Sequence, residues 1–165
     1  MATNNIQLLF QVYERLTASD IQAVVFGGWA EELLRISPPR AHGDIDLLCF
    51  EQDFAKVDAF IRQSTDISEI PAKHLSHKRA FVIGNTAVEL LLVRMEAGGR
   101  CITACYDYEL TWPGSSTVNV SIPNLGSLSV ACPAILFFYR KCYPAVADAR
   151  RRYLNTKYDA HSSAA

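Results

Sequence analysis

Two neighbouring stretches decide the fold of this chain: IQAVVFGGWA at residues 21–30 and PRAHGDIDLLCF at residues 39–50. The first begins with a short apolar, β-branched run, 21–26, which predicts a buried strand. After Gly27 and Gly28, residues 29–36 have the apolar spacing of a helix. The second stretch predicts another strand over 44–50. A strand, a glycine pair, a helix and a further strand therefore follow one another closely.

The pattern of further elements extends from this centre in both directions. Amphipathic spacing predicts helices, and two apolar runs joined by a Gly-Asn-Thr turn predict a hairpin. Residues 100–131 suggest irregular structure with two short strands. Proline at 144 should kink or end the helix that precedes it. The helices are expected at 4–16, 53–63, 133–143 and 145–158, and the strands at 79–83, 87–93, 118–122 and 127–131.

Strands that alternate with helices indicate an α/β (α+β) fold: a mixed β-sheet flanked by helices, with helices at the C-terminus. The hairpin implies that the sheet is not wholly parallel. The length of 165 residues predicts a single domain over 1–165, with a core of about 1–131 and a helical part of about 132–160. A formal net charge of −1 gives no long-range attraction to a polyanion, so the charge disfavours nucleic acid as a partner.

The five cysteines are odd in number and fit no compact disulfide framework. Reduced thiols, together with the lack of a signal-peptide pattern, favour the cytoplasm. No apolar run reaches the length of a membrane-spanning helix, so no membrane association is expected.

Asp44 and Asp46 flank Ile45 on a predicted strand, and alternation along a strand places both carboxylates on one face. Their repulsion favours a divalent cation, and oxygen ligands suit Mg²⁺. The alternative is a solvated strand end. Glu89 lies within the apolar run 87–93 and needs a partner there. That partner is either the same metal site or a lysine or arginine.

Gly27 and Gly28 lie between a strand and a helix, where glycine lets backbone N–H groups approach a phosphate. The alternative is a tight turn without a ligand. The chain has neither a Gly-x-Gly-x-x-Gly pattern nor a Gly-Lys-Ser/Thr pattern. Dinucleotide-binding and P-loop interpretations therefore have no support.

The residues Gly27-Gly28-Trp29-Ala30, followed by 39–46, resemble the front end of aminoglycoside 2″-nucleotidyltransferases and lincosamide nucleotidyltransferases. These families belong to the polymerase-β-like nucleotidyltransferase superfamily. The similarity is most specific over 21–50 and extends weakly through Glu89 into the C-terminal helices. A Lys-Asp-x-x-Asp pattern of the relatives is only partly present, which leaves Lys141 and Lys157 as phosphate-contacting alternatives.

The resemblance implies a role for each matching position. Gly27 and Gly28 would line the triphosphate pocket, and Asp44 and Asp46 would hold Mg²⁺. Glu89 would be a third metal ligand or the general base. Two residues on the loop before the metal strand could contact phosphates, namely Arg40 and His42.

The implied reaction moves a nucleoside monophosphate from a Mg²⁺-bound nucleoside triphosphate, with ATP preferred, to a hydroxyl of a small molecule such as an aminoglycoside or lincosamide. Residues 106–109 with Trp112 could form an acidic aromatic cleft for an aminoglycoside, or could simply pack. The compact chain is also compatible with a homodimer that completes the acceptor site. Two alternatives are a non-catalytic nucleotide-binding module and a toxin–antitoxin-type nucleotidyltransferase acting on a macromolecule.

Overall fold

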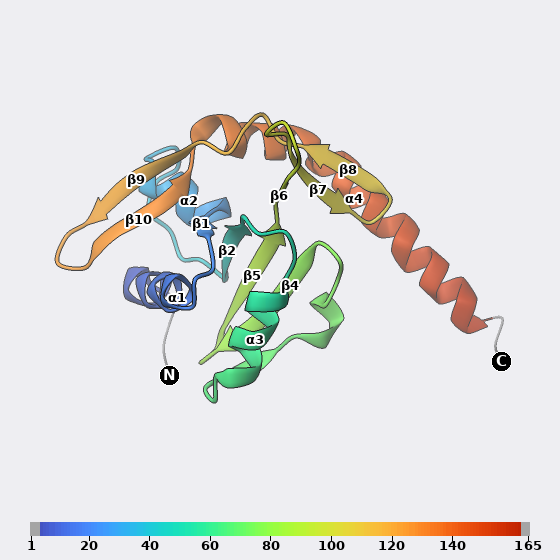
Figure 1. Cartoon of the computed structure of the whole chain (residues 1–165), viewed down its shortest axis with the longest axis horizontal. Helices are drawn as coiled ribbons and strands as arrows, with labels where there is room; N and C mark the ends of the chain where they lie inside the picture. Colours follow the sequence, from blue (N-terminus) through green and yellow to red (C-terminus); the bar gives the residue numbers. More distant parts are fainter. Residues whose placement is uncertain (1–3, 163–165) are drawn as a thin grey trace.

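The computed structural model describes residues 4–162 and shows a mixed sheet, a smaller second sheet and four α-helices (Figure 1). The helices are α1 (Ile6–Ala18), α2 (Gly27–Leu33), α3 (Ala55–Gln63) and α4 (Pro133–Ser162), with a 3₁₀ turn η1 (Pro71–Lys73). The strands are β1 (Ala23–Val25), β2 (Asp44–Cys49), β3 (Ile67–Glu69), β4 (Lys78–Ile83), β5 (Thr86–Leu92), β6 (Arg94–Met95), β7 (Cys101–Cys105), β8 (Tyr108–Thr111), β9 (Thr117–Ile122) and β10 (Gly126–Ala131).

The larger sheet has seven strands in the order β3-β4-β5-β2-β1-β10-β9. Strand β2 lies near its middle, parallel to β5 and antiparallel to β1. The predicted mixed α/β fold is therefore confirmed. The apolar part of β2 is fully buried, because a strand with neighbours on both sides and helices over the sheet has no solvent-facing surface.

Helix α1 shows how local sequence determines an element here. Its N-cap residue, Asn5, accepts a hydrogen bond from the backbone N–H of Leu8 at 2.9 Å. Leu9, Val12 and Leu16 follow at helical spacing and are buried against the sheet. The predicted helix over 4–16 is confirmed within two residues at each end.

The prediction of irregular structure over 100–131 was wrong for its first part. Strands β7 and β8 lie there, and together with β6, just before this segment, they form a separate three-stranded sheet beside α4 (Figure 1). Thr103 is buried on this sheet and donates a hydrogen bond to the Leu92 carbonyl, while the indole of Trp112 donates to the Thr103 hydroxyl. Strands β7 and β8 are only 5 and 4 residues long, and a run this short gives little periodicity from which to predict a strand.

Of the two outcomes expected at Pro144, a kink or an end of the helix, the structure shows the kink, so the prediction of two separate C-terminal helices was wrong. A single helix, α4, includes both segments, with Pro133 as its first residue and Pro144 inside it. Figure 1 shows α4 changing direction as it passes over the sheet, and its C-terminal part extends away from the rest of the molecule. Proline lacks an N–H and crowds the carbonyl four residues earlier, so a bend accommodates it without ending the helix.

Within residues 4–162, no helix combines the length and the apolar character needed to cross a bilayer.

A buried arginine gives a first prediction about stability. Arg79 is 8% exposed and donates two hydrogen bonds to the Asp58 carboxylate, at 2.6 and 3.2 Å. Replacing Arg79 with Met should lower the free energy of unfolding by about 2–4 kcal/mol, because it leaves Asp58 without its partner. Arg15→Met breaks the exposed pair with Asp66 and should cost less than about 1 kcal/mol. Urea unfolding measures both, and equal losses would contradict the prediction.

Candidate active site

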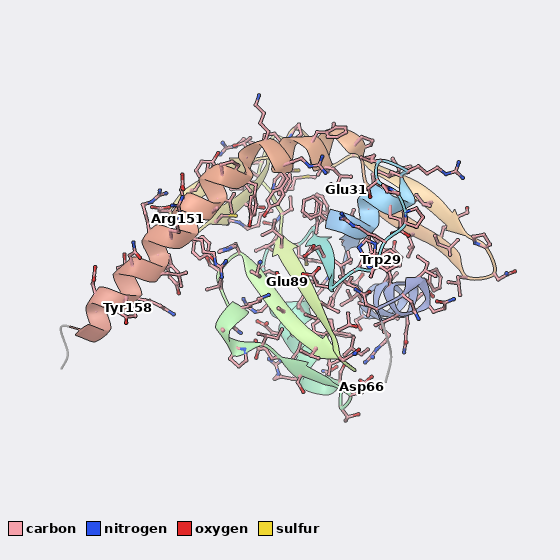
Figure 2. The ribbon with its side chains drawn as sticks, turned by 180° about the vertical axis from the view of Figure 1, so that it is seen from behind. Trp29, Glu31, Asp66, Glu89, Arg151 and Tyr158 are labelled. Atoms are coloured by element: carbon pink, nitrogen blue, oxygen red, sulfur yellow. The ribbon has the colours of Figure 1, made fainter. Side chains whose placement is uncertain are left out.

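The two aspartates of the central strand lie on one face, as predicted. Asp44 is exposed and Asp46 half-buried, while Ile45 between them is fully buried on the opposite face. Because β2 and β5 are parallel and in register, Asp46 lies directly beside Glu89. The three acidic residues are thus brought to one end and one face of two neighbouring strands. Figure 2 shows Glu89 on the strand that lies beneath α4.

Asp46 occupies an electrostatically unfavourable position. Burial, and then the negative charge of Asp44, raise the pKa of the Asp46 carboxyl to about 6. The ammonium groups of Lys78 and Lys73 act in the opposite direction but do not cancel this effect. The folded protein therefore holds a carboxylate whose charged form is disfavoured, and a bound cation would relieve this.

This shift predicts a pH-dependent gain in stability for Asp46→Asn. The carboxyl has a higher pKa in the folded chain than in the unfolded chain, so its destabilising effect is absent below about pH 4 and fully present above about pH 6. In metal-free protein, Asp46→Asn should raise the free energy of unfolding by about 2–3 kcal/mol at pH 7.5 and leave it almost unchanged at pH 4. Urea unfolding with a chelator at both pH values tests this. Asp66→Asn, at an exposed carboxylate stabilised by Arg15, should bring no gain.

Glu89 is held by two lysines that sequence reasoning missed. The Lys78 ammonium donates a hydrogen bond to one carboxylate oxygen at 2.7 Å, and Lys73 contacts the other. A lysine was one of the two partners considered for Glu89. The hairpin register could have identified Lys78: Ala80 lies opposite Glu89, so Lys78 is two residues away on the same face. Lys73 is on η1, which no motif predicts.

The glycine pair forms the first turn of α2 instead of a separate turn before it. Gly27 has a φ of +60°. A Cβ atom there would lie 2.5 Å from Oδ2 of Asp46, well inside van der Waals contact. Glycine is therefore required at 27 both by the backbone conformation and by the close approach of the Asp46 carboxylate.

The loop before β2 lies over Gly28, and its two predicted phosphate ligands differ in their surroundings. The side chain of His42 is 5% exposed, its Nε2 lies 2.7 Å from Glu32, and its ring packs on Trp29. Arg40 is about half exposed, and its guanidinium lies closest to the position of a Gly28 Cβ. The structure thus leaves Arg40 available to a ligand, whereas His42 fixes the loop to α2.

A hollow of about 460 Å³ opens in front of Asp46 and Glu89, between the sheet and α4. We call it the first hollow. Gly27 and Glu31 line it from α2, Asp46 and Glu89 from the sheet, and Arg140 from α4. Figure 2 shows Glu31 on α2, where α2 faces α4. The hollow is large enough for part of a nucleotide, and two of the three acidic residues, Asp46 and Glu89, line it.

Residues 8–96, more than half of the chain, match the family model described as aminoglycoside-2″-adenylyltransferase. The chain belongs to this family. Its members are nucleotidyltransferases, so the predicted enzyme class and the resemblance are both confirmed. The matched segment contains all of the predicted site residues. Membership of this enzyme family does not favour the two alternative functions, a non-catalytic nucleotide-binding module and a toxin–antitoxin-type nucleotidyltransferase.

Two solved structures share the fold of this aminoglycoside-2″-adenylyltransferase family member. The lincosamide antibiotic adenylyltransferase LnuA, with lincomycin bound, has a TM-score of 0.63 and 13% identity, over 79% of this chain and 82% of LnuA. ANT(2″)-Ia, in complex with adenylyl-2″-tobramycin, has a TM-score of 0.55 and 12% identity, over 89% of this chain and 99% of ANT(2″)-Ia. At such identities the likeness establishes the fold. No curated protein sequence matches the chain significantly.

The aspartate pair of this family member fits Mg²⁺. Among residues 4–162, no group of three or more His, Cys, Asp and Glu side chains is arranged to hold a metal. Mg²⁺, however, is commonly bound by one or two carboxylates, with water and substrate phosphates completing its octahedron. Asp44 and Asp46 supply such a pair. A bound cation would offset the repulsion between their two negative charges.

The acidic aromatic stretch of this family member does not form an open acidic cleft. Asp107 accepts two hydrogen bonds from Arg152, and Glu109 lies 3.5 Å from Arg100. Trp112 is 4% exposed and stacks on Tyr139. The packing alternative therefore describes this stretch better. Lys141 and Lys157 do not line the first hollow, whereas Lys78 does.

Proposed function

We propose that the protein transfers the AMP group of Mg²⁺-bound ATP to a hydroxyl of a small molecule. The observation that supports this most is the arrangement of Asp44, Asp46 and Glu89 on neighbouring strands, beside a glycine that closely approaches Asp46. Family membership supports the adenylyl group as the one transferred. The relatives with lincomycin and adenylyl-2″-tobramycin bound make antibiotics the first acceptors to test.

The donor would occupy the first hollow. Asp44 and Asp46 would hold Mg²⁺, which when bound supplies positive charge to the triphosphate oxygens. Gly27 lines this hollow beside Asp46, and its missing side chain lets the Asp46 carboxylate lie close to the backbone at the start of α2. Arg140 of α4, which lines the first hollow, would contact the outer phosphates, and so would Arg40 beside Gly28. Both arginines now lie beside Glu31, from which a phosphate would draw them away.

In the transfer, the acceptor oxygen forms a bond to the α-phosphorus, and the bond from that phosphorus to the pyrophosphate oxygen breaks. The hydroxyl proton passes to the Glu89 carboxylate, and pyrophosphate leaves. Of the two roles inferred for Glu89, we adopt that of proton acceptor, because the ammonium groups of Lys73 and Lys78 already balance its charge without a metal ion. Those lysines hold the carboxylate in place while the acceptor binds.

A pyrophosphate-release assay tests the proposal. Purified protein, Mg²⁺ and each of the four nucleoside triphosphates are combined with aminoglycosides, lincosamides and simple polyols, and the product is identified by mass. Acceptor-dependent release with ATP, and a mass gain of one AMP, is the expected result. If ATP with Mg²⁺ does not bind in calorimetry, the assignment of this site as a nucleotide site is wrong. If another triphosphate is used instead, only the preference for ATP is wrong.

A further inference from the structure

The groove between the sheet and α4 continues past Glu89 into another hollow of about 470 Å³, which we call the second hollow. Lys78, Glu89, Tyr139 and Tyr143 line both hollows, so Glu89 lies where they meet. Gly27 and Asp46 line only the first hollow. An acceptor in the second hollow would therefore lie on the other side of Glu89 from the donor, with its hydroxyl next to the proposed base.

The lining of the second hollow carries a net positive charge. Four cationic side chains line it, and Glu89 is the only acidic side chain that does so within the described part of the chain. The four are Lys73, Lys78, Arg150 and Arg151. Arg151 is offset by Asp148, and the two lysines share the single charge of Glu89. The lining therefore keeps an excess of positive charge.

The electrostatics of Lys78 agree with this excess. Burial lowers the pKa of the Lys78 ammonium, the positive charges of Lys73 and Arg150 lower it further, and the negative charge of Asp46 only partly opposes them. A ligand that brings negative charge would stabilise all three cations. A polycation would face the same repulsion that they now exert on one another.

The walls of the second hollow are aromatic. Tyr106, Tyr139, Tyr143 and Tyr153 line it, and the rings of Tyr106 and Tyr153 lie 5.0 Å apart. Tyrosine walls suit the flat or ring-shaped body of a small molecule, which they contact through apolar faces and hydroxyl groups. The volume fits such a molecule and not a folded macromolecule.

We propose that the second hollow is the acceptor site, and that the acceptor is a small hydroxyl compound that also carries a phosphate or carboxylate group. This inference rests on the proposed function. The acidic group would lie against Arg150 and Lys73, which directs the hydroxyl towards Glu89. Aminoglycosides, which are polycations, would be poor acceptors.

Matched pairs of acceptors test the charge preference. Glucose 6-phosphate is compared with glucose, and 4-hydroxybenzoate with 4-hydroxybenzyl alcohol, beside tobramycin and lincomycin. Binding to the protein in the presence of Mg²⁺ and a non-hydrolysable ATP analogue is measured by calorimetry, and turnover with ATP by pyrophosphate release. The anionic member of at least one pair should bind at least tenfold more tightly than its neutral partner. Equal binding within both pairs, or preferred use of tobramycin, overturns the proposal.

The variant Arg150→Gln tests whether the Arg150 charge causes the preference for anionic acceptors. It should weaken binding of the anionic member at least tenfold while the KM for ATP changes less than twofold. Arg152→Gln, at a residue on the same helix that pairs with Asp107 outside the second hollow, should leave both unchanged. If Arg150→Gln raises the KM for ATP instead, the second hollow belongs to the donor. Transfer to RNA in place of small molecules would also overturn the proposal.

These outcomes separate the two proposals. Loss of Mg²⁺-dependent ATP binding contradicts the proposed function itself. ATP binding that persists without an anion preference contradicts only the acceptor assignment.

Discussion

Replacing Asp46 with Asn should lower kcat for nucleotidyl transfer by at least about 1,000-fold, with the fold intact. The variant keeps the size of the side chain but removes half of the carboxylate pair proposed to hold Mg²⁺. A factor of 1,000 corresponds to about 4 kcal/mol of transition-state stabilisation, within what a lost metal ion contributes. The same change should raise the stability of the metal-free protein at pH 7.5, so inactivity and increased stability should occur together.

Asp44→Asn should lower kcat by a similar factor, because both carboxylates are proposed to hold the same Mg²⁺ ion. Asp66→Asn is the matched control. It also removes an aspartate charge, but near β3, at the edge of the sheet and far from Glu89 (Figure 2). The control should retain full activity. An active Asp46→Asn variant that still requires Mg²⁺ would show that the cation binds elsewhere.

The second large effect is expected at Gly27. Gly27→Ala places a methyl group 2.5 Å from Oδ2 of Asp46 and forces an L-residue to a φ of +60°. The backbone conformation alone should cost about 1–2 kcal/mol of folding free energy. The methyl group must also displace the Asp46 carboxylate from its position, so we expect kcat/KM to fall by at least about 100-fold.

Gly43→Ala is the control for this substitution. Gly43 precedes Asp44 directly, yet a Cβ atom there meets nothing within 4 Å. Activity and the midpoint of urea unfolding should both stay close to those of the wild type. The activity of Gly28→Ala should lie between those of Gly27→Ala and Gly43→Ala. The new Cβ meets the end of the flexible Arg40 side chain, which can move away, but also the buried ring of His42, which cannot. Equal activity of all three variants would exclude a role for the close approach at Gly27.

The central part of the fold could be predicted because its signals are local. An apolar strand, a glycine pair and the Asp-Ile-Asp triplet each depend on a few consecutive residues. The register of β5 beside β2, which brings Glu89 next to Asp46, is a tertiary fact, but an acid in an apolar strand already indicated that a partner was needed. The roles assigned to these residues in catalysis stay predictions.

What the sequence did not reveal depends on contacts between distant segments. Lys73 reaches Glu89 from a short 3₁₀ turn with no periodicity of its own. Strand β7 has only 5 residues and pairs with β6 and β8, so its place in the fold depends on that pairing more than on its own sequence. The continuity of α4 through Pro144 likewise depends on packing against the sheet, which local propensity does not include.

The division of the groove between two parts of the chain has an evolutionary consequence. Residues of β2 and α2, within the first 50 positions, line only the first hollow, whereas α4 contributes to both hollows and supplies much of the wall of the second. The family match covers 8–96 and therefore ends well before α4. Under the proposed assignment, substitutions along one face of α4 can change which compounds are modified, while β2, which is proposed to bind the nucleotide through Mg²⁺, stays unchanged. A lineage could thus diversify its substrates without rebuilding its chemistry.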